Sequence, residues 1–125
     1  MKKYNNYSFV LINQSQIIYK SKSRGLKPLI FCFKNYRQQM RGAMVFDKVV
    51  GRAAALILVV AGVARVEAPL ICAEAIKILR AKKIEVGYIK KVKNILNRTG
   101  NDLCPMEKLS AGKTIKEFKK DLNLP

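Results

Sequence analysis

Asp47 and Lys48 stand between a short apolar segment and an unusually apolar helix. Ligands of open α/β sheets bind outside the carboxyl ends of the strands. The N–H groups at the start of the following helix also suit an anion. Both residues are therefore candidates for catalysis or ligand binding. A structural alternative explains them too: Asp47 caps the helix and Lys48 is solvated.

Gly51 and Arg52 follow within this helix, which we expect to cover residues 48–61. A glycine inside a helix costs about 1 kcal/mol relative to alanine. Gly51 therefore indicates either a close contact between helix and sheet or room for a ligand. Arg52 is a candidate phosphate clamp. Alternatively, its charged end reaches solvent from an otherwise buried helix.

Cys104 precedes a short predicted helix that contains Glu107 and Lys108. A cysteine just before a helix and near a positive charge can have a lowered thiol pKa. Cys104 is thus a candidate nucleophile or redox thiol, although a capping or packing role is the favoured interpretation. Glu107 is a candidate acid or base, because burial raises the pKa of a carboxyl group. Lys108 is a candidate ligand-binding residue.

Lys27 opens an earlier predicted helix, and Asn97 and Arg98 lie in a polar turn. Lys27 is expected at the same sheet edge as Asp47, because both segments follow strands of one sheet. Asn97 and Arg98 are candidates for hydrogen bonds to a ligand, although ordinary turn chemistry accounts for them as well. We expect one pocket that joins three segments: Lys27, Asp47 with Lys48, and Cys104 with Glu107 and Lys108.

The chain has no histidine, and its three cysteines are widely spaced. The lack of histidine excludes Ser-His-Asp and Cys-His catalysis and any His-ligated zinc. The cysteines form no CxxC pair, so the sequence predicts neither a disulfide framework nor a zinc knuckle. Cys32 and Cys72 lie in apolar surroundings and are expected to pack in the core. We predict no bound metal and no cofactor.

The chain is strongly basic, with 25 Lys and Arg, 8 Asp and Glu, and a net charge of +17. Such a balance indicates an anionic partner such as nucleic acid or nucleotide phosphate. The alternative is a compositional background, since the chain is rich in Ile, Asn and Tyr and its lysines are dispersed. The sequence shows no RNP motif, zinc finger or aromatic-interleaved basic patch. Any nucleic-acid binding is expected to be weak and sequence-independent.

The amino-terminal sequence MKKYNNYS lacks the long apolar stretch of a signal peptide. The most apolar segment, residues 53–64, is shorter than the roughly 20 residues of a membrane span. We therefore predict a cytoplasmic protein without membrane contact. A homo-oligomer is a candidate assembly.

Strand and helix patterns alternate along the 125 residues, which suit one domain, with loose ends at 1–7 and 121–125. Strands are predicted at 8–13, 16–19, 43–46, 64–68 and 84–89. Helices are predicted to start at Lys27, Lys48 and Pro69, after Pro105, and at Thr114. This order predicts an α/β fold: a three-layer α/β/α sandwich around a mixed sheet of about five strands.

Three motifs carry a family resemblance: RGLKPL at 24–29, FDKVVGRAAAL at 46–56 and CPMEK at 104–108. Together they resemble an uncharacterised prokaryotic family assigned to the cytidine deaminase-like superfamily, over about residues 7–120. The resemblance implies a mixed sheet flanked by helices. In true deaminases the second helix opens with His/Cys-x-Glu and the third with Pro-Cys-x-x-Cys. The corresponding segments here, 25–28 and 47–51, contain no zinc ligand, so deamination by a zinc-bound hydroxide is not supported.

Two classes of function stay open. The first is a deaminase-like domain without catalytic zinc that binds a nucleotide-like or other anionic small ligand. The second is a non-enzymatic basic module that binds nucleic acid or protein. The sequence does not decide whether the chain is an enzyme.

Overall fold

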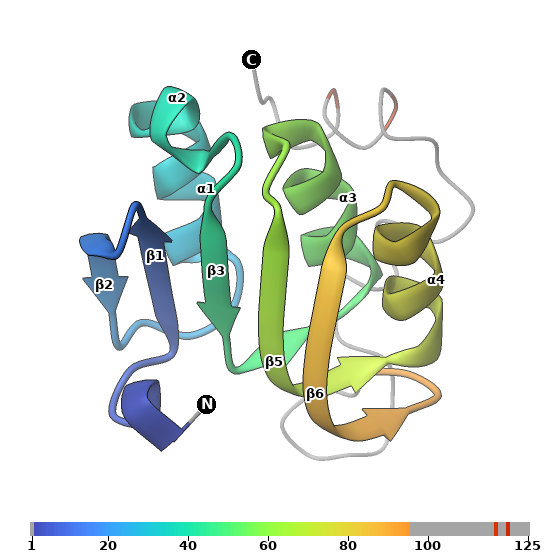
Figure 1. Cartoon of the computed structure of the whole chain (residues 1–125). Helices are drawn as coiled ribbons and strands as arrows, with labels where there is room; N and C mark the ends of the chain where they lie inside the picture. Colours follow the sequence, from blue (N-terminus) through green and yellow to red (C-terminus); the bar gives the residue numbers. More distant parts are fainter. Residues whose placement is uncertain (1, 96–116, 118–119, 121–125) are drawn as a thin grey trace.

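The computed structural model describes residues 2–95, 117 and 120. Their strands form one mixed sheet with helices packed against it (Figure 1). This arrangement confirms the predicted α/β class. The strands are β1 (Phe9–Asn13), β2 (Gln16–Ser21), β3 (Met44–Asp47), β4 (Val49–Val50), β5 (Arg65–Cys72) and β6 (Glu85–Val92). The helices are the 3-10 helix η1 (Lys2–Tyr4), α1 (Lys27–Asn35), α2 (Arg37–Met40), α3 (Arg52–Ala61) and α4 (Ala73–Ala81).

The antiparallel half of the sheet starts with the predicted hairpin of β1 and β2. Its two turn residues, Gln14 and Ser15, have φ angles of 51° and 66°. Positive φ at both positions characterises the type I′ turn, whose twist matches that of paired strands. The pairing shifts between Leu11↔Tyr19 and Ile12↔Ile17. Ile18 is therefore an extra residue, a β-bulge in the edge strand β2.

The parallel half is built around β5. β3 and β4 pair with successive stretches of β5, in the registers Val45↔Val66 and Val50↔Ile71. β6 pairs with β5 along nearly all of its length. β3 and β4 must therefore share one edge of β5 and leave the other to β6. The spatial order is β2, β1, β3 with β4, β5 and β6.

The helices of the sheet connections lie on one face. The connections from β2 to β3, from β3 to β5 and from β5 to β6 all advance in the same direction across the sheet. Right-handed crossovers that advance in one direction place their helices on the same side, and Figure 1 shows α1, α3 and α4 behind the sheet. On the opposite face, Tyr4 and Tyr7 cover Val10 and Phe46. The second helical layer of the predicted sandwich is not among the described residues.

α3 is the central helix, as its composition predicted. Residues 53–58 and Ala61 are buried, and the helix packs between α1 and α4. It ends at Gly62, whose φ of 75° is readily adopted by glycine. Within the described part of the chain, no helix is long and apolar enough to cross a bilayer.

The predicted start of α3 at Lys48 is wrong by four residues. Val49 and Val50 are β-branched residues that favour strands, and they continue the pairing with β5. The Lys48 carbonyl accepts a hydrogen bond from Leu70 N–H at 3.1 Å. Asp47 is consequently not a helix cap. Gly51 is the N-cap and lies outside the helix interior, so the expected cost of an interior glycine does not arise.

The prediction that Pro69 starts a helix is also wrong. Pro69 lies inside β5, and α4 begins only at Ala73. Proline has no N–H to donate to a neighbouring strand. The register with β6 contains Ala68↔Tyr88 and Leu70↔Lys90 but passes over Pro69. The sheet thus tolerates the proline at a position that makes no ladder pair with β6.

Candidate functional site

The candidate site lies where the carboxyl ends of the parallel strands meet. β3, β5 and β6 are parallel, and β2 runs in the same direction because β2 and β3 are both antiparallel to β1. Lys27 opens the helix after β2, and Asp47 ends β3. The topology therefore brings Lys27, Asp47 and Lys48 to one sheet edge.

Asp47 is the only charged residue of the described part that is buried, with 7% of its surface exposed. Along β3, Val45 faces the helices and Phe46 the opposite side, so Asp47 faces the helices. Burial raises the pKa of its carboxyl group well above the ordinary value, while a hydrogen bond from Val49 N–H acts in the opposite direction. The group therefore keeps its proton to a higher pH than an exposed aspartate does.

The backbone of Lys48 forms hydrogen bonds to two neighbouring segments at this edge. Its N–H donates to the carbonyl of Ser8 at 2.9 Å, and its carbonyl accepts from Leu70. These two bonds connect the end of β3 to the residue before β1 and to β5. The Lys48 residue itself is exposed, as is Lys27. Both ammonium groups are thus available to an anion in solvent.

Gly51 and Arg52 form the start of α3. Gly51 is buried, and its carbonyl accepts the N–H of Ala55 at 3.0 Å, as an N-cap carbonyl does. Arg52 Nη1 forms an ion pair with Glu74 Oε1 at the start of α4. The Arg52 side chain is mostly buried, whereas that of Glu74 is exposed. Arg52 therefore links the beginnings of two neighbouring helices, a role that the sequence did not reveal.

Cys72 is a second residue of this edge that the sequence analysis did not place there. It is buried, and its sulfur accepts the N–H of Ala75 at 3.4 Å as the N-cap of α4. In the sequence Cys72 directly precedes Ala73 and Glu74, and it can be identified as the N-cap of α4 once the end of β5 is known. Cys32 packs inside α1, and burial raises the pKa of its thiol to about 12. Cys32 is thus an unreactive core residue, as predicted.

The remaining predicted site residues, Asn97, Arg98, Cys104, Glu107 and Lys108, lie outside the described residues. Their proposed approach to Asp47 stays a prediction. In the part of the chain that is described, no three His, Cys, Asp or Glu side chains gather as a metal site requires.

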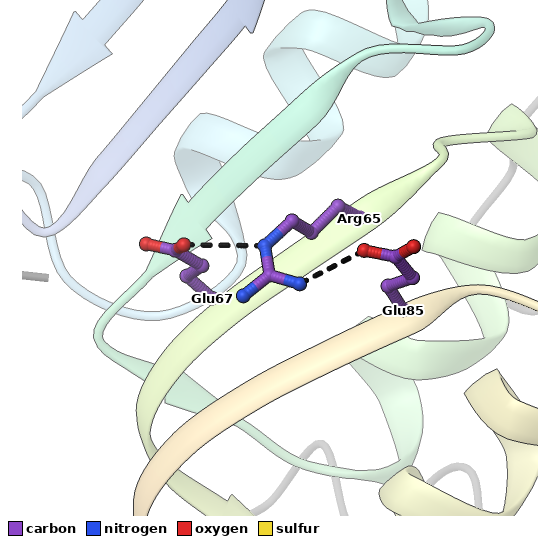
Figure 2. A network of polar contacts seen from close by, with 3 residues as sticks. All are labelled: Arg65, Glu67 and Glu85. Atoms are coloured by element: carbon purple, nitrogen blue, oxygen red, sulfur yellow. Dashed lines mark hydrogen bonds and ion pairs between the residues drawn. The ribbon is translucent and has the colours of Figure 1, made fainter.

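A separate polar network occupies the face of the sheet opposite the helices (Figure 2). Arg65 Nε contacts Glu67 at 3.2 Å, and Arg65 Nη1 contacts Glu85 at 3.0 Å. A Cβ atom on Gly87 would lie 2.9 Å from Arg65 Nη2, so the missing side chain provides space for the guanidinium. Two carboxylates around one guanidinium give this cluster a net negative charge, which makes it unsuited to binding an anion.

Nearly the whole chain matches a known protein family and a solved structure of that family. A family model described as TM1506, domain of unknown function (DUF1893), matches residues 1–121. A solved DUF1893 family protein (TM1506) from Thermotoga maritima is 28% identical, with a TM-score of 0.87, over 97% of this chain and 82% of that one. No curated protein matches.

The fold is also similar to part of Acinetobacter baumannii RibD. Form 1 of that structure is 19% identical with a TM-score of 0.54, over 65% of this chain and 27% of RibD. Form 2 is 22% identical with a TM-score of 0.52, over 64% and 27%. This chain therefore matches about a quarter of RibD, and the likeness concerns the fold alone. By its match over nearly the whole sequence, the chain belongs to the DUF1893 family.

Proposed function

We propose that this protein is a zinc-free relative of the cytidine deaminase-like proteins that binds a nucleotide-like anionic small molecule at the carboxyl edge of its sheet. The fold similarity to RibD and the sequence motifs support the relationship. The observation that carries the proposal is the buried Asp47 at this edge.

Asp47 supplies a hydrogen-bond donor. A carboxyl group that stays protonated can donate its O–H to an acceptor, whereas a carboxylate can only accept. Its raised pKa extends the pH range in which Asp47 is a donor. Nucleobases present ring nitrogens and carbonyl oxygens as acceptors. A base or a similar heterocycle is therefore the part of the ligand that we assign to Asp47.

Positive groups lie along the same edge of the sheet as Asp47. Lys27 and Lys48 are exposed, and Arg52 stands at the start of α3. Helix starts attract anions through their N–H groups and the helix dipole. A phosphate or carboxylate of the ligand would be held by these cations. Gly51, the N-cap of α3, has no side chain that could block a ligand from the start of this helix.

The residues at the helix starts do not fit the zinc that the deaminase relationship implies. α1 opens with Lys27 and Pro28, and α3 with Gly51 and Arg52. None of these is a zinc ligand, and the two cations would repel a metal ion. Cys32 lies within α1, where its thiol keeps its proton to a pKa of about 12. We therefore derive no reaction step through zinc.

The test is a titration with CMP, AMP and inorganic phosphate, followed by two-dimensional NMR of ¹⁵N-labelled protein. We expect a nucleotide to shift the amide signals of Lys27, Asp47, Lys48 and Arg52 and to leave those of Glu85 unchanged. The same spectra would report whether Asn97, Arg98, Cys104, Glu107 and Lys108 respond. Saturable shifts confined to other regions, or none at millimolar nucleotide, would contradict the proposal.

Two substitutions of Asp47 refine the test. Asp47→Asn keeps a donor of similar shape, whereas Asp47→Leu removes it and leaves the volume nearly unchanged. We expect nucleotide affinity to persist in the first variant and to fall about tenfold in the second, the loss of roughly one hydrogen bond. Glu85→Gln is the matched control, since it removes a carboxylate on the opposite face. Equal affinity of Asp47→Leu and the wild type would refute the role of Asp47.

A further inference from the structure

The amino-terminal part of the chain combines cations and aromatic rings without any acid. Residues 1–46 contain no Asp or Glu; Asp47 is the first acidic residue of the sequence. The same stretch holds nine of the Lys and Arg residues and eight of the ten Phe and Tyr residues. It forms η1, β1, β2, α1, α2 and most of β3. The sequence pattern showed no interleaved basic patch, because folding is needed to bring these side chains together.

Three rings form a cluster at the outer edge of the sheet. Tyr19 comes from β2, Phe31 from α1, and Tyr36 from the residue between α1 and α2. The centroid of Tyr19 lies 4.9 Å from that of Phe31 and 6.1 Å from that of Tyr36, whose ring is stacked with it. Phe31 is 45% exposed, a large share for a ring of this size. The cluster therefore offers an aromatic surface to solvent.

Cations flank this aromatic surface. Lys27 lies four residues before Phe31 on α1 and Lys34 three residues after it, so both share its side of the helix. Both lysines are exposed. Arg37, at the start of α2, holds its guanidinium 4.3 Å from the ring of Phe33. No acidic side chain belongs to any of these elements.

A hollow of about 310 Å³ adjoins the cluster at the tip of the β1–β2 hairpin. Its lining contains no charged residue and consists of five carboxamides and one isoleucine: Asn13, Gln14, Gln16, Ile18, Gln38 and Gln39. Ile18 lines the hollow, and Tyr19, the next residue, belongs to the ring cluster; both pack against the same core, so β2 links hollow and cluster. Asn13 Nδ2 donates to the Gln39 carbonyl at 2.7 Å and ties the hairpin to α2. Carboxamides both donate and accept hydrogen bonds.

We propose that this surface, which we call the aromatic–amide strip, binds single-stranded nucleic acid. Its members are the ring cluster, Lys27, Lys34, Arg37 and the carboxamide hollow. Unpaired bases stack on exposed aromatic rings, and phosphates bind nearby Lys and Arg. Asn and Gln side chains form paired hydrogen bonds with base edges. Because a duplex hides its base faces, the strip favours a single strand over a duplex. The strip shares Lys27 with the proposed small-molecule site at Asp47, but no other residue of the strip belongs to that site.

The test measures binding of fluorescently labelled oligo(dT), oligo(U) and a duplex of equal length to the full chain by anisotropy. We expect the single strands to bind more tightly than the duplex. We expect Phe31→Ala to weaken single-strand binding about tenfold, the effect of losing one stacked base. Ile89→Ala is the matched control, because Ile89 is a 71% exposed apolar residue on β6, away from the strip. Circular dichroism verifies that both variants are folded.

Lys34→Gln separates phosphate contacts from stacking. We expect it to reduce the slope of log affinity against log salt by about 0.7, the value for one phosphate contact with a single strand, whereas Phe31→Ala should leave that slope unchanged. A protein that binds duplex as tightly as single strands, or a Phe31→Ala variant that binds like Ile89→Ala, would overturn the proposal. Either result would mean that net charge alone attracts nucleic acid.

Discussion

Replacing Asp47 by asparagine isolates the effect of one buried carboxyl group on stability. The two side chains have nearly the same shape, and the asparagine oxygen can still accept the hydrogen bond of Val49 N–H. The asparagine does not titrate. The difference in unfolding free energy between the two proteins, followed against pH, therefore reports the ionisation of Asp47.

The sign follows from the direction of the pKa shift. Burial raises the folded-state pKa of Asp47 above the unfolded value, which is near the ordinary 3.8. Below that value the carboxyl group is protonated in both states, and no stability is lost. Between the two pKa values the folded state binds more protons than the unfolded state. Wild-type stability therefore falls, relative to Asp47→Asn, as the pH rises through this window.

The slope in this window is about 1.4 kcal/mol per pH unit, the value for one proton that is bound in the folded state and released in the unfolded state. Urea unfolding at several pH values from 4 to 9 measures it for both proteins. Glu85→Gln is the control, because Glu85 is largely exposed and its replacement should leave the pH profile of the wild type nearly intact. A constant difference between wild type and Asp47→Asn over this range would refute the argument. Asp47 would then be as well solvated or paired in its charged form as in the unfolded chain.

Three further predictions concern the core, the open sheet face and the metal. Ala53→Asp or Leu56→Asp should abolish soluble expression by burying an unpaired charge at several kcal/mol, whereas Ala81→Asp at an exposed alanine should not. Gly87→Ala should change the unfolding free energy by less than about 1 kcal/mol, because the better strand propensity of alanine offsets the displacement of the Arg65 side chain. In an Arg65→Ala background we expect Gly87→Ala to raise the unfolding free energy. A lower unfolding free energy in that background would contradict the prediction. Elemental analysis should find no stoichiometric zinc; one tightly bound zinc per chain would refute the assignment of a lost metal centre.

The sequence was informative where composition and local chemistry agree. The apolar runs on either side of Gln14 and Ser15 predicted the hairpin, and the composition of residues 53–61 predicted a central helix. It failed at 48–50 and at Pro69, where pairing with a distant strand overrides local signals. Val49 and Val50 continue the sheet because Leu70 and Ile71 lie opposite them. Such a preference depends on residues about twenty positions away and is not visible in a local window.

The candidate site shows the same difference between what the local sequence predicts and what depends on the fold. The charge of Asp47 next to an apolar helix identified it, but its burial depends on where β3 ends and which side of the sheet it faces. The ion pair of Arg52 with Glu74 joins residues in two helices, 22 positions apart. Only the parallel arrangement of β4 and β5 brings those helix starts together. Local pattern thus found the residues, and topology determined their partners.

The distribution of acids bears on the meaning of the high net charge. Eight acids spread evenly over 125 residues would place roughly three among the first 46, where there are none. Beyond that stretch the described glutamates include three that hold arginines, since Glu74 contacts Arg52 while Glu67 and Glu85 contact Arg65. Residues 1–46 carry nine cations and no acid, whereas residues 47–125 carry the other sixteen cations together with all eight acids, so the excess positive charge is denser in the first stretch. The asymmetry therefore favours a functional origin for the positive charge near the aromatic–amide strip, where a strand of phosphates would supply the missing negative partners.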